Sequence, residues 1–238
     1  MATRPVAIFR FNRTEGPGYF AEWLDAQGIG WHLVPLDEGV PVPDDPRAFS
    51  GIGMMGGPMS VNDELPWIAP LSALLRAAVD REIPVIGHCL GGQLLARAMG
   101  APVTRAKVAE IGWLDVDVCS RAAQQEWFGG RTAFNTFQWH YDAFALPAGA
   151  TPVLTNAFNA NQAFVVDDRH IGLQCHVEMT RALTETWLAS GSDELPSAST
   201  PATQTASEIR RDLDARIDAL HAVANDIYAR WAQELRRS

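Results

Sequence analysis

Residues 83–100 are the part of this 238-residue chain that most constrains how it can fold. The stretch opens with a short apolar run at 83–86, typical of a strand that is buried on both faces of a sheet. It closes with residues 93–99, whose apolar side chains mark one face of a helix, and with Gly100, a residue typical of a helix end. The stretch therefore predicts a buried strand that passes directly into a helix.

The junction reads Gly87-His88-Cys89-Leu90-Gly91, a G-x-nucleophile-x-G pattern. In such a sharp turn the central residue is strained, and a side chain two residues to either side would collide with the turn or the helix. The turn would place the Cys89 sulfur beside the first amides of the helix, which favour a thiolate. A nucleophilic cysteine is one interpretation, and a small packing cysteine in a glycine-rich junction is the other.

Composition and charge exclude several function classes. The net charge of −9 argues against nonspecific binding to nucleic acid. The three cysteines contain no C-x-x-C pair, so neither a disulfide framework nor a zinc site is indicated, and no cofactor is expected. The chain start lacks an apolar signal block, and no stretch approaches the length of a membrane span. We therefore expect a cytoplasmic protein without a membrane partner.

The order of apolar runs predicts an α/β fold with a doubly wound, mixed and mostly parallel sheet flanked by helices. Strands alternate with helices over the first hundred residues, as in parallel sheets. The expected strands in this part are 6–11, 31–36, 51–55 and 83–86, and the expected helices are 19–27, 67–82 and 93–99.

The pattern changes after residue 100. Residues 110–118 alternate between apolar and polar, which favours a half-exposed antiparallel strand, and further short strands are expected at 134–140, 162–166 and 171–176. These strands predict a small antiparallel extension of the sheet.

The chain is expected to divide into three parts. Residues 1–190 would form the catalytic domain, and residues 191–207, rich in Ser, Thr, Ala, Pro and Asp, a flexible loop. Residues 208–238 would form a long C-terminal helix, extending to about Arg236 and packed on the same domain.

A thiol nucleophile needs a base, and the base needs a group that orients it. Among the six histidines, His176 stands out because Glu178 lies two residues further on. Residues two apart at the end of a strand point to the same side, so the carboxylate can hold Nδ1 and leave Nε2 free for the thiol proton. An exposed H-x-E pair on a surface strand is the ordinary alternative.

Acyl transfer also needs amide donors where the oxyanion develops. Gly56-Gly57-Pro58 follows a buried strand and lets the backbone approach a ligand closely, and the N–H of Leu90 comes directly after the nucleophile. A plain turn is the alternative for the Gly-Gly-Pro segment.

Taken together, these segments resemble the class I glutamine amidotransferases, the Cys-His-Glu triad family. The matching pieces lie in the family's order at 56–58, 87–93 and 174–178. The similarity covers roughly residues 51–178. It is greatest to the stand-alone, GMP-synthase-like branch, judged by the segments 57–62, 110–113 and 138–142.

The resemblance implies a role for each matching residue. Cys89 would attack the side-chain amide of glutamine, form a γ-glutamyl thioester and release ammonia. His176 would act as general base and then as general acid, with Glu178 as its orienter, and Gly57 and Leu90 would supply the oxyanion-hole amides. The substrate contacts that the resemblance implies are Gln93, Met59, Trp139, His140 and Tyr141.

Two positions depart from the family's pattern. The family often has Phe and Pro around its histidine, where this chain has Cys175 and Val177, and often has an aliphatic residue where this chain has His88. We expect Cys175 and His88 to pack in the core. Either change could alter the choice of substrate.

Release of ammonia from L-glutamine is the leading interpretation of function. No second catalytic domain fits after Glu178 and no P-loop is present, so a separate synthetase subunit would have to use the ammonia. The alternative is a γ-glutamyl hydrolase for γ-glutamyl amines or peptides, with a wider pocket that Trp67, Trp113 or Trp139 could line. A third interpretation is a dormant module, activated when a partner turns the Gly56-Gly57 peptide.

Overall fold

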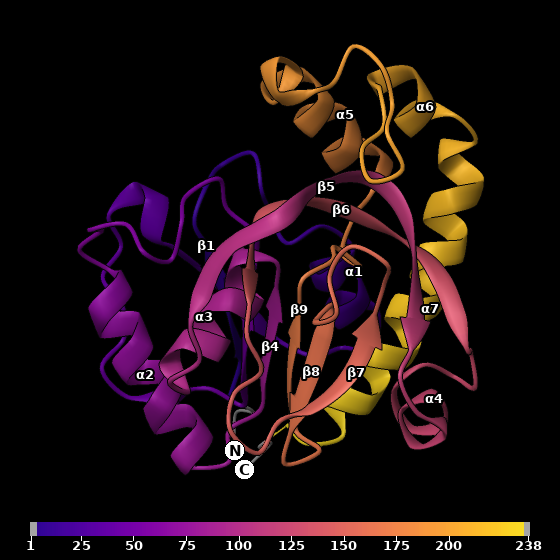
Figure 1. Cartoon of the computed structure of the whole chain (residues 1–238). Helices are drawn as coiled ribbons and strands as arrows, with labels where there is room; N and C mark the ends of the chain where they lie inside the picture. The colour runs from indigo at the N-terminus through magenta and orange to yellow at the C-terminus, as the bar shows by residue number, and fades with distance from the viewer. Residues whose placement is uncertain (1–3, 236–238) are drawn as a thin grey trace.

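A mixed sheet of nine strands runs through residues 4–235, the part of the chain that the computed structural model describes (Figure 1). In their order across the sheet the strands are β2 (Trp31–Pro35), β1 (Val6–Arg10), β3 (Gly51–Met54), β4 (Val85–His88), β9 (His170–Leu173), β8 (Ala163–Val166), β7 (Thr151–Thr155), β5 (Val103–Val118) and β6 (Ala133–Phe144).

The sheet has a parallel and an antiparallel half. Strands β2, β1, β3, β4 and β9 pair in parallel, whereas β8, β7, β5 and β6 pair antiparallel to their neighbours. The mixed α/β sheet agrees with the sequence prediction, but the antiparallel half is larger than predicted. Strands β5 and β6 have 16 and 12 residues, and they arch over the central strands in Figure 1.

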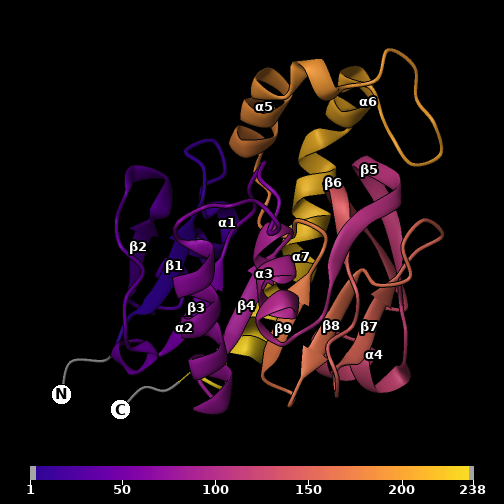
Figure 2. The ribbon, with the colours of Figure 1, turned by 60° about the vertical axis from the view of Figure 1, so that its left-hand side comes forward.

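Helices cover both faces of the sheet. They are α1 (Gly18–Ala26), α2 (Ile68–Asp80), α3 (Leu90–Ala98), α4 (Arg121–Trp127), α5 (Arg181–Ser190), α6 (Ala206–Arg210) and α7 (Leu213–Ala232), with short 3₁₀ turns at Leu36–Glu38, Pro46–Ala48 and Ser192–Glu194. In the view of Figure 2, α2 and α3 lie in front of the sheet and α7 lies behind it.

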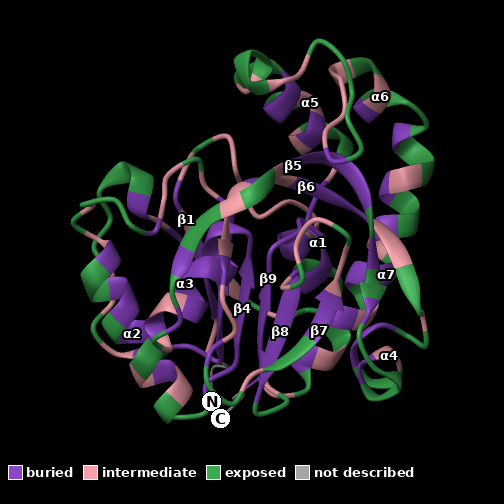
Figure 3. Cartoon of the chain, in the orientation of Figure 1, coloured by how far each residue is buried: buried purple, intermediate pink, exposed green. Residues whose placement is uncertain are grey.

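The core is divided by the sheet into two clusters, because side chains alternate between its faces. On β1, Val6 and Ile8 join the cluster beneath α1 and α7, whereas Ala7 and Phe9 join the cluster beneath α2 and α3. Figure 3 shows the central strands buried and the outer sides of the helices exposed. The strand ends that meet in this core position the loops that carry the candidate site.

Most predicted elements are present, but several bounds differ. The strand expected at 83–86 begins only at Val85, because Ile83 N–H still donates to Ala78 O at the end of α2 and Pro84 has no N–H to donate. The strand expected at 171–176 ends at Leu173, and His176 forms an isolated bridge with Phe137. Strand β7 and helices α4 and α5 were not predicted.

The helix predicted over 208–236 is two helices in the structure. Between α6 and α7, Asp212 adopts φ 55, a left-handed conformation through which an α-helix does not continue. Helix α6 begins at a capping box in which Thr205 and Glu208 satisfy each other's backbone N–H. Position 236 lies outside the described residues.

Part of the loop predicted at 191–207 lies along β5. Ile111 N–H donates to Ala202 O at 3.0 Å, and Gln204 N–H donates back to Ile111 O at 2.9 Å. The Gln204 side chain closes the same contact, accepting from Trp113 N–H and donating to Trp113 O, each at 2.9 Å. No helix of the described chain is both long and apolar enough to span a bilayer.

We expect Gln204→Leu to lower the free energy of unfolding by about 1–3 kcal/mol, because it leaves the backbone N–H and the backbone carbonyl of the buried Trp113 without this partner. Urea denaturation measures the change. Gln125→Leu, on the exposed side of α4, is the matched control and should stay within about 0.5 kcal/mol of the parent. Equal stability of the two variants would contradict the account of this loop.

Candidate active site

Cys89 occupies the sharp turn between β4 and α3, with φ 48 and ψ −106. The glycines around it are required by space. A Cβ on Gly87 would lie 2.3 Å from Gly91 C, and a Cβ on Gly91 would lie 2.6 Å from Met54 O. A residue other than Gly at either position would therefore push the helix away from the strand, as the sequence pattern predicted.

Three backbone hydrogen bonds hold the turn in place. Cys89 N–H donates to Leu173 O at 2.8 Å, Gly91 N–H to Met55 O at 3.1 Å, and Gln93 N–H to Cys89 O at 2.9 Å. The turn is thereby tied to β9 on one side, to the end of β3 on the other and to its own helix. The Cys89 side chain is held at the floor of a cavity, and the residue is only 5% exposed.

His176 and Glu178 follow β9 and form a buried pair. His176 Nδ1 lies 2.7 Å from Glu178 Oε1, and the residues are 1% and 2% exposed. The Trp187 ring packs edge-on against the imidazole with 4.7 Å between the ring centroids. The structure therefore brings together the two residues that the sequence predicted as base and orienter.

The charges around His176 favour its protonated form. Burial alone would lower the pKa of His176, but the charges of Glu178 and Cys89 outweigh burial and raise this pKa well above its ordinary value. Burial would likewise raise the pKa of Glu178, but the charge and the hydrogen bond of His176 lower it. His176 Nε2 is buried and has no hydrogen-bond partner among the described residues, so it is available for a proton.

Two backbone amides near the nucleophile are uncommitted. The N–H groups of Gly57 and Leu90 donate no hydrogen bond within residues 4–235. The two residues lie in contact, since a Cβ on Gly57 would lie 2.5 Å from Leu90 Cδ2. These are the two amides that the sequence predicted for an oxyanion hole.

His88 and Cys175 are core residues, as expected. His88 is fully buried, with Nδ1 at 3.1 Å from Met54 O and Nε2 at 3.2 Å from Tyr228 Oη, so Nδ1 donates and Nε2 accepts. Cys175 is also fully buried, and burial raises the pKa of its thiol to about 12. Neither residue lines the cavity above Cys89.

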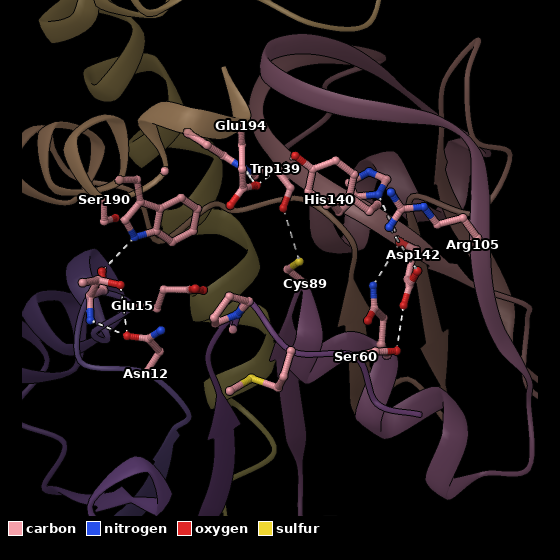
Figure 4. Close-up of a pocket in the computed structure, with 18 residues that line it drawn as sticks. Asn12, Glu15, Ser60, Cys89, Arg105, Trp139, His140, Asp142, Ser190 and Glu194 are labelled. Carbon is pink, nitrogen blue, oxygen red and sulfur yellow. Dashed lines mark hydrogen bonds and ion pairs between the residues drawn. The ribbon is translucent and has the colours of Figure 1, made fainter. Parts of the chain in front are cut away.

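A cavity of about 630 Å³ opens above Cys89 (Figure 4). The predicted site residues that line it are Gly57, Met59, Cys89, Gln93, Trp139, His140 and Tyr141. The other three predicted residues, His176, Glu178 and Leu90, are buried behind this lining.

The cavity extends to both sides of the sulfur. Figure 4 shows His140, Asp142, Arg105 and Ser60 on one side of Cys89, and Asn12, Glu15 and Ser190 on the other. On the first side Asp142 accepts from Ser60 Oγ at 2.8 Å and lies 3.9 Å from Arg105 Nη1. This side therefore presents one cation and one anion close together.

Comparison with known proteins gives the family. The model of the glutamine amidotransferase class-I family matches residues 22–190. The chain belongs to the class I glutamine amidotransferase family. Its fold matches the crystal structure of a glutamine amido transferase from Methylobacillus flagellatus with a TM-score of 0.96 and 45% identity, over 100% of this chain and 97% of that one.

Curated relatives of this family member differ in their names and lengths. The putative glutamine amidotransferase-like protein YfeJ of Salmonella typhimurium is 28% identical over 77% of this chain and 80% of its own. Gamma-glutamyl peptidase 4 of Arabidopsis thaliana is 26% identical over 68% and 67%. The chain spans only 28% of the GMP synthase of Aeropyrum pernix, to which it is 30% identical over 60% of its own length.

Sequence reasoning missed several residues that line the cavity of this family member. They come from the loops after β1 and β3, from β5 and β6, and from α5 and the 3₁₀ turn after it: Asn12, Thr14, Glu15, Ser60, Arg105, Asp142, Trp187, Ser190, Gly191 and Glu194. The loop after β1 could have been found, because the carboxyl ends of parallel strands meet at one edge. The α5 residues had no such signal.

Two of the three tryptophans suggested for the pocket lie elsewhere. Trp139 lines the cavity, and its Nε1 donates to Glu194 Oε2 at 2.9 Å. Trp113 is in the core, where its Nε1 donates to Ile209 O, and Trp67 packs against the Phe11 ring at 4.9 Å. Trp187, which sequence reasoning did not single out, is the other indole in the lining.

Glu15 is a second carboxylate beside His176. A Cβ on Gly56 would lie 2.5 Å from Glu15 Oε2 and 2.9 Å from His176 Cε1, so the absence of a side chain at Gly56 leaves room for both groups. Burial raises the pKa of Glu15 to about 7, with smaller increases from Glu178 and Glu194, although the charge of His176 acts the other way.

The raised pKa of Glu15 makes the stability of the fold depend on pH. The folded state holds a proton on Glu15 that the unfolded state loses near its ordinary pKa, so the carboxyl destabilises the fold progressively as pH rises from about 4.5 to about 7. The free energy of unfolding of Glu15→Gln, relative to that of the parent, should therefore rise by about 1–3 kcal/mol from pH 4.5 to pH 8. Urea denaturation at the two pH values measures the gain, with exposed Glu22→Gln as control. A difference in the free energy of unfolding between variant and parent that does not vary with pH would contradict the raised pKa of Glu15.

Proposed function

We propose that this protein hydrolyses the side-chain amide of L-glutamine through a γ-glutamyl thioester on Cys89. The observation that carries the proposal is the position of Cys89, in a strained turn at the floor of a cavity, with the His176–Glu178 pair buried behind it. A nucleophile, a base and an orienting carboxylate in this order are what acyl transfer by a thiol requires.

The first half of the reaction forms the thioester. His176 Nε2 takes the thiol proton, and the sulfur attacks the δ-carbon of the amide. The negative charge on the amide oxygen is stabilised by the N–H groups of Gly57 and Leu90, which are not used elsewhere in the described chain. When the tetrahedral intermediate collapses, the C–N bond breaks and the imidazolium returns its proton to the leaving nitrogen, which departs as ammonia.

The second half releases glutamate. Water enters beside His176, which removes a proton as the oxygen attacks the thioester carbon. The C–S bond then breaks and the proton passes to the sulfur, which restores the Cys89 thiol. Glu178 keeps the imidazole in one orientation throughout and stabilises its cation, as the raised pKa of His176 indicates.

The α-amino and α-carboxylate groups of glutamine suit the Arg105 side of the cavity. The Arg105 guanidinium is the cationic side chain in the lining, and Asp142 beside it is an anion, so the pair complements a zwitterion. Gln93, Met59, Trp139, His140 and Tyr141 line the same cavity and are proposed as the remaining substrate contacts. A separate synthetase subunit is proposed to use the ammonia, because the matched GMP synthase is several times longer than the matching region.

The cavity volume favours a second candidate function, hydrolysis of γ-glutamyl amines or peptides. About 630 Å³ is space for a ligand larger than glutamine, and part of it lies beyond Cys89 on the side of Asn12 and Glu15. The same thioester would form, with an amine instead of ammonia as the leaving group. A relative of this chain is named a gamma-glutamyl peptidase.

The test is release of ammonia and glutamate from L-glutamine by the purified chain, beside release of amine from one γ-glutamyl amine. We expect turnover that Cys89→Ser abolishes and that Glu178→Gln lowers by roughly 10²–10⁴-fold, because Gln cannot hold the imidazolium. Cys119→Ser is the matched control, since Cys119 is exposed and lies outside the cavity.

The outcomes separate the candidates. Turnover of the γ-glutamyl amine but not of glutamine would show that γ-glutamyl amines are the substrate class. No turnover of either substrate, with Cys89 still labelled by a glutamine-like electrophile, would mean a dormant site that needs a partner. Silence without labelling of Cys89 would disprove the proposed catalytic role.

A further inference from the structure

Gln174 is a buried residue that the proposed mechanism does not use, although it contacts the nucleophile. Its Nε2 lies 3.6 Å from Cys89 Sγ, and the residue is fully buried. Within the described chain it is the one side-chain amide whose hydrogen bond ends on this sulfur. We propose that Gln174 is a catalytic residue, whose amide donates to the Cys89 thiolate, and that Gln93 is the positioning residue that keeps this amide oriented.

The orientation of the Gln174 amide follows from a chain of hydrogen bonds. Gln93 Nε2 donates to Asp142 O at 3.0 Å and to Gln174 Oε1 at 3.3 Å. A backbone carbonyl can only accept, so the Gln93 side chain must present its NH₂ group there. The Gln174 oxygen must then face Gln93, and the NH₂ group of Gln174 must face the sulfur. Rotating either side-chain amide by half a turn would place two donors or two acceptors against each other.

The backbone around Gln174 is equally constrained. Gln174 N–H donates to Gln162 O at 2.8 Å, and the preceding carbonyl, Leu173 O, accepts from Cys89 N–H at 2.8 Å. The donor and the sulfur are therefore held by adjacent hydrogen bonds on β9 and the turn. Little reorganisation is needed when charge appears on the sulfur, which is the condition for an effective electrostatic contribution.

A donor at this place answers a specific difficulty of the site. The Sγ atom lies 3.9 Å from Trp139 O, a carbonyl that can accept from the thiol. Once the proton moves to His176, the same carbonyl faces a negative sulfur and disfavours it. The Gln174 amide offers a positive dipole to that sulfur, and a hydrogen bond to a charged group is about twice as strong as a neutral one.

Other titratable groups also influence this sulfur and contribute to the pH midpoint of alkylation in the parent protein. His176 and Cys175 interact with Cys89 directly, Glu178, Glu15 and His88 surround the imidazole, and Asp142, Glu194, Arg105, His140 and Tyr141 line the cavity. The experiment therefore compares variants that leave all of these groups in place.

The measurement is the pH dependence of Cys89 alkylation by iodoacetamide, with the modified residue identified by mass spectrometry. A Cys119→Ser background removes the exposed thiol, and Cys175 is buried. We expect Gln174→Leu to move the pH midpoint of alkylation upward by about one to two units, as the loss of a hydrogen bond to a charged group predicts. Gln93→Leu should move it in the same direction by less, because it releases only the far end of the Gln174 amide.

Gln138→Leu is the matched control. Gln138 is also fully buried, and its Nε2 donates to Gln162 Oε1 at 3.0 Å, but it makes no contact with the sulfur. Its alkylation midpoint should equal that of the parent. Equal midpoints in Gln174→Leu and Gln138→Leu would overturn the proposal, and if Gln174→Leu fails to fold, an unshifted Gln93→Leu overturns it.

The proposal rests on Cys89 as nucleophile, and the alkylation readout keeps the two ideas apart because it needs no turnover. A shifted midpoint in a protein that hydrolyses neither substrate would support the role of Gln174 and count against the proposed function. In an active protein, kcat/KM of Gln174→Leu should fall about ten- to a hundredfold at neutral pH and recover as pH rises. A merely structural role would give a loss that does not recover.

Discussion

The structure depends on the close contact between β4 and α3 at Cys89. Gly87 and Gly91 lie so near to each other that no side chain fits between them, and this allows the positive φ of Cys89. Because the turn is tied to β9 through Leu173 O, the same contact sets the place of the segment that carries His176. A single local constraint thus determines where the nucleophile and its proposed base meet.

Charged side chains lie both behind and in front of the Cys89 sulfur. Behind the sulfur, Glu178 holds Nδ1 of the imidazole and its charge favours the protonated ring, while Glu15 lies beside the same ring. In front of it, the cavity offers Arg105 and Asp142 on one side and a further space on the other. The buried amides of Gln93 and Gln174 connect the cavity wall to the sulfur. Hydrogen bonds therefore join the cavity wall, where substrate would bind, to the nucleophilic sulfur.

The parts of this arrangement that could be predicted are those with a local physical signature. The turn at Cys89 needs its glycines within two residues, and His176 needs Glu178 at a spacing of two, so short segments were enough. The break at Asp212 was not predictable from the apolar periodicity, which continues on both sides of it. Trp187 on α5 and Glu194 in the 3₁₀ turn after it reach the cavity only through tertiary packing, which a local sequence pattern does not encode.

The most direct test of the central claim is to trap the covalent intermediate. The purified chain is mixed with L-glutamine or with a γ-glutamyl amine, quenched in acid within the first turnovers and analysed by peptide mass spectrometry. We expect a γ-glutamyl group on the peptide that contains Cys89, released by hydroxylamine and absent from Cys89→Ser. Turnover of either substrate without any such adduct, or an adduct on Cys119 or Cys175 instead, would contradict it.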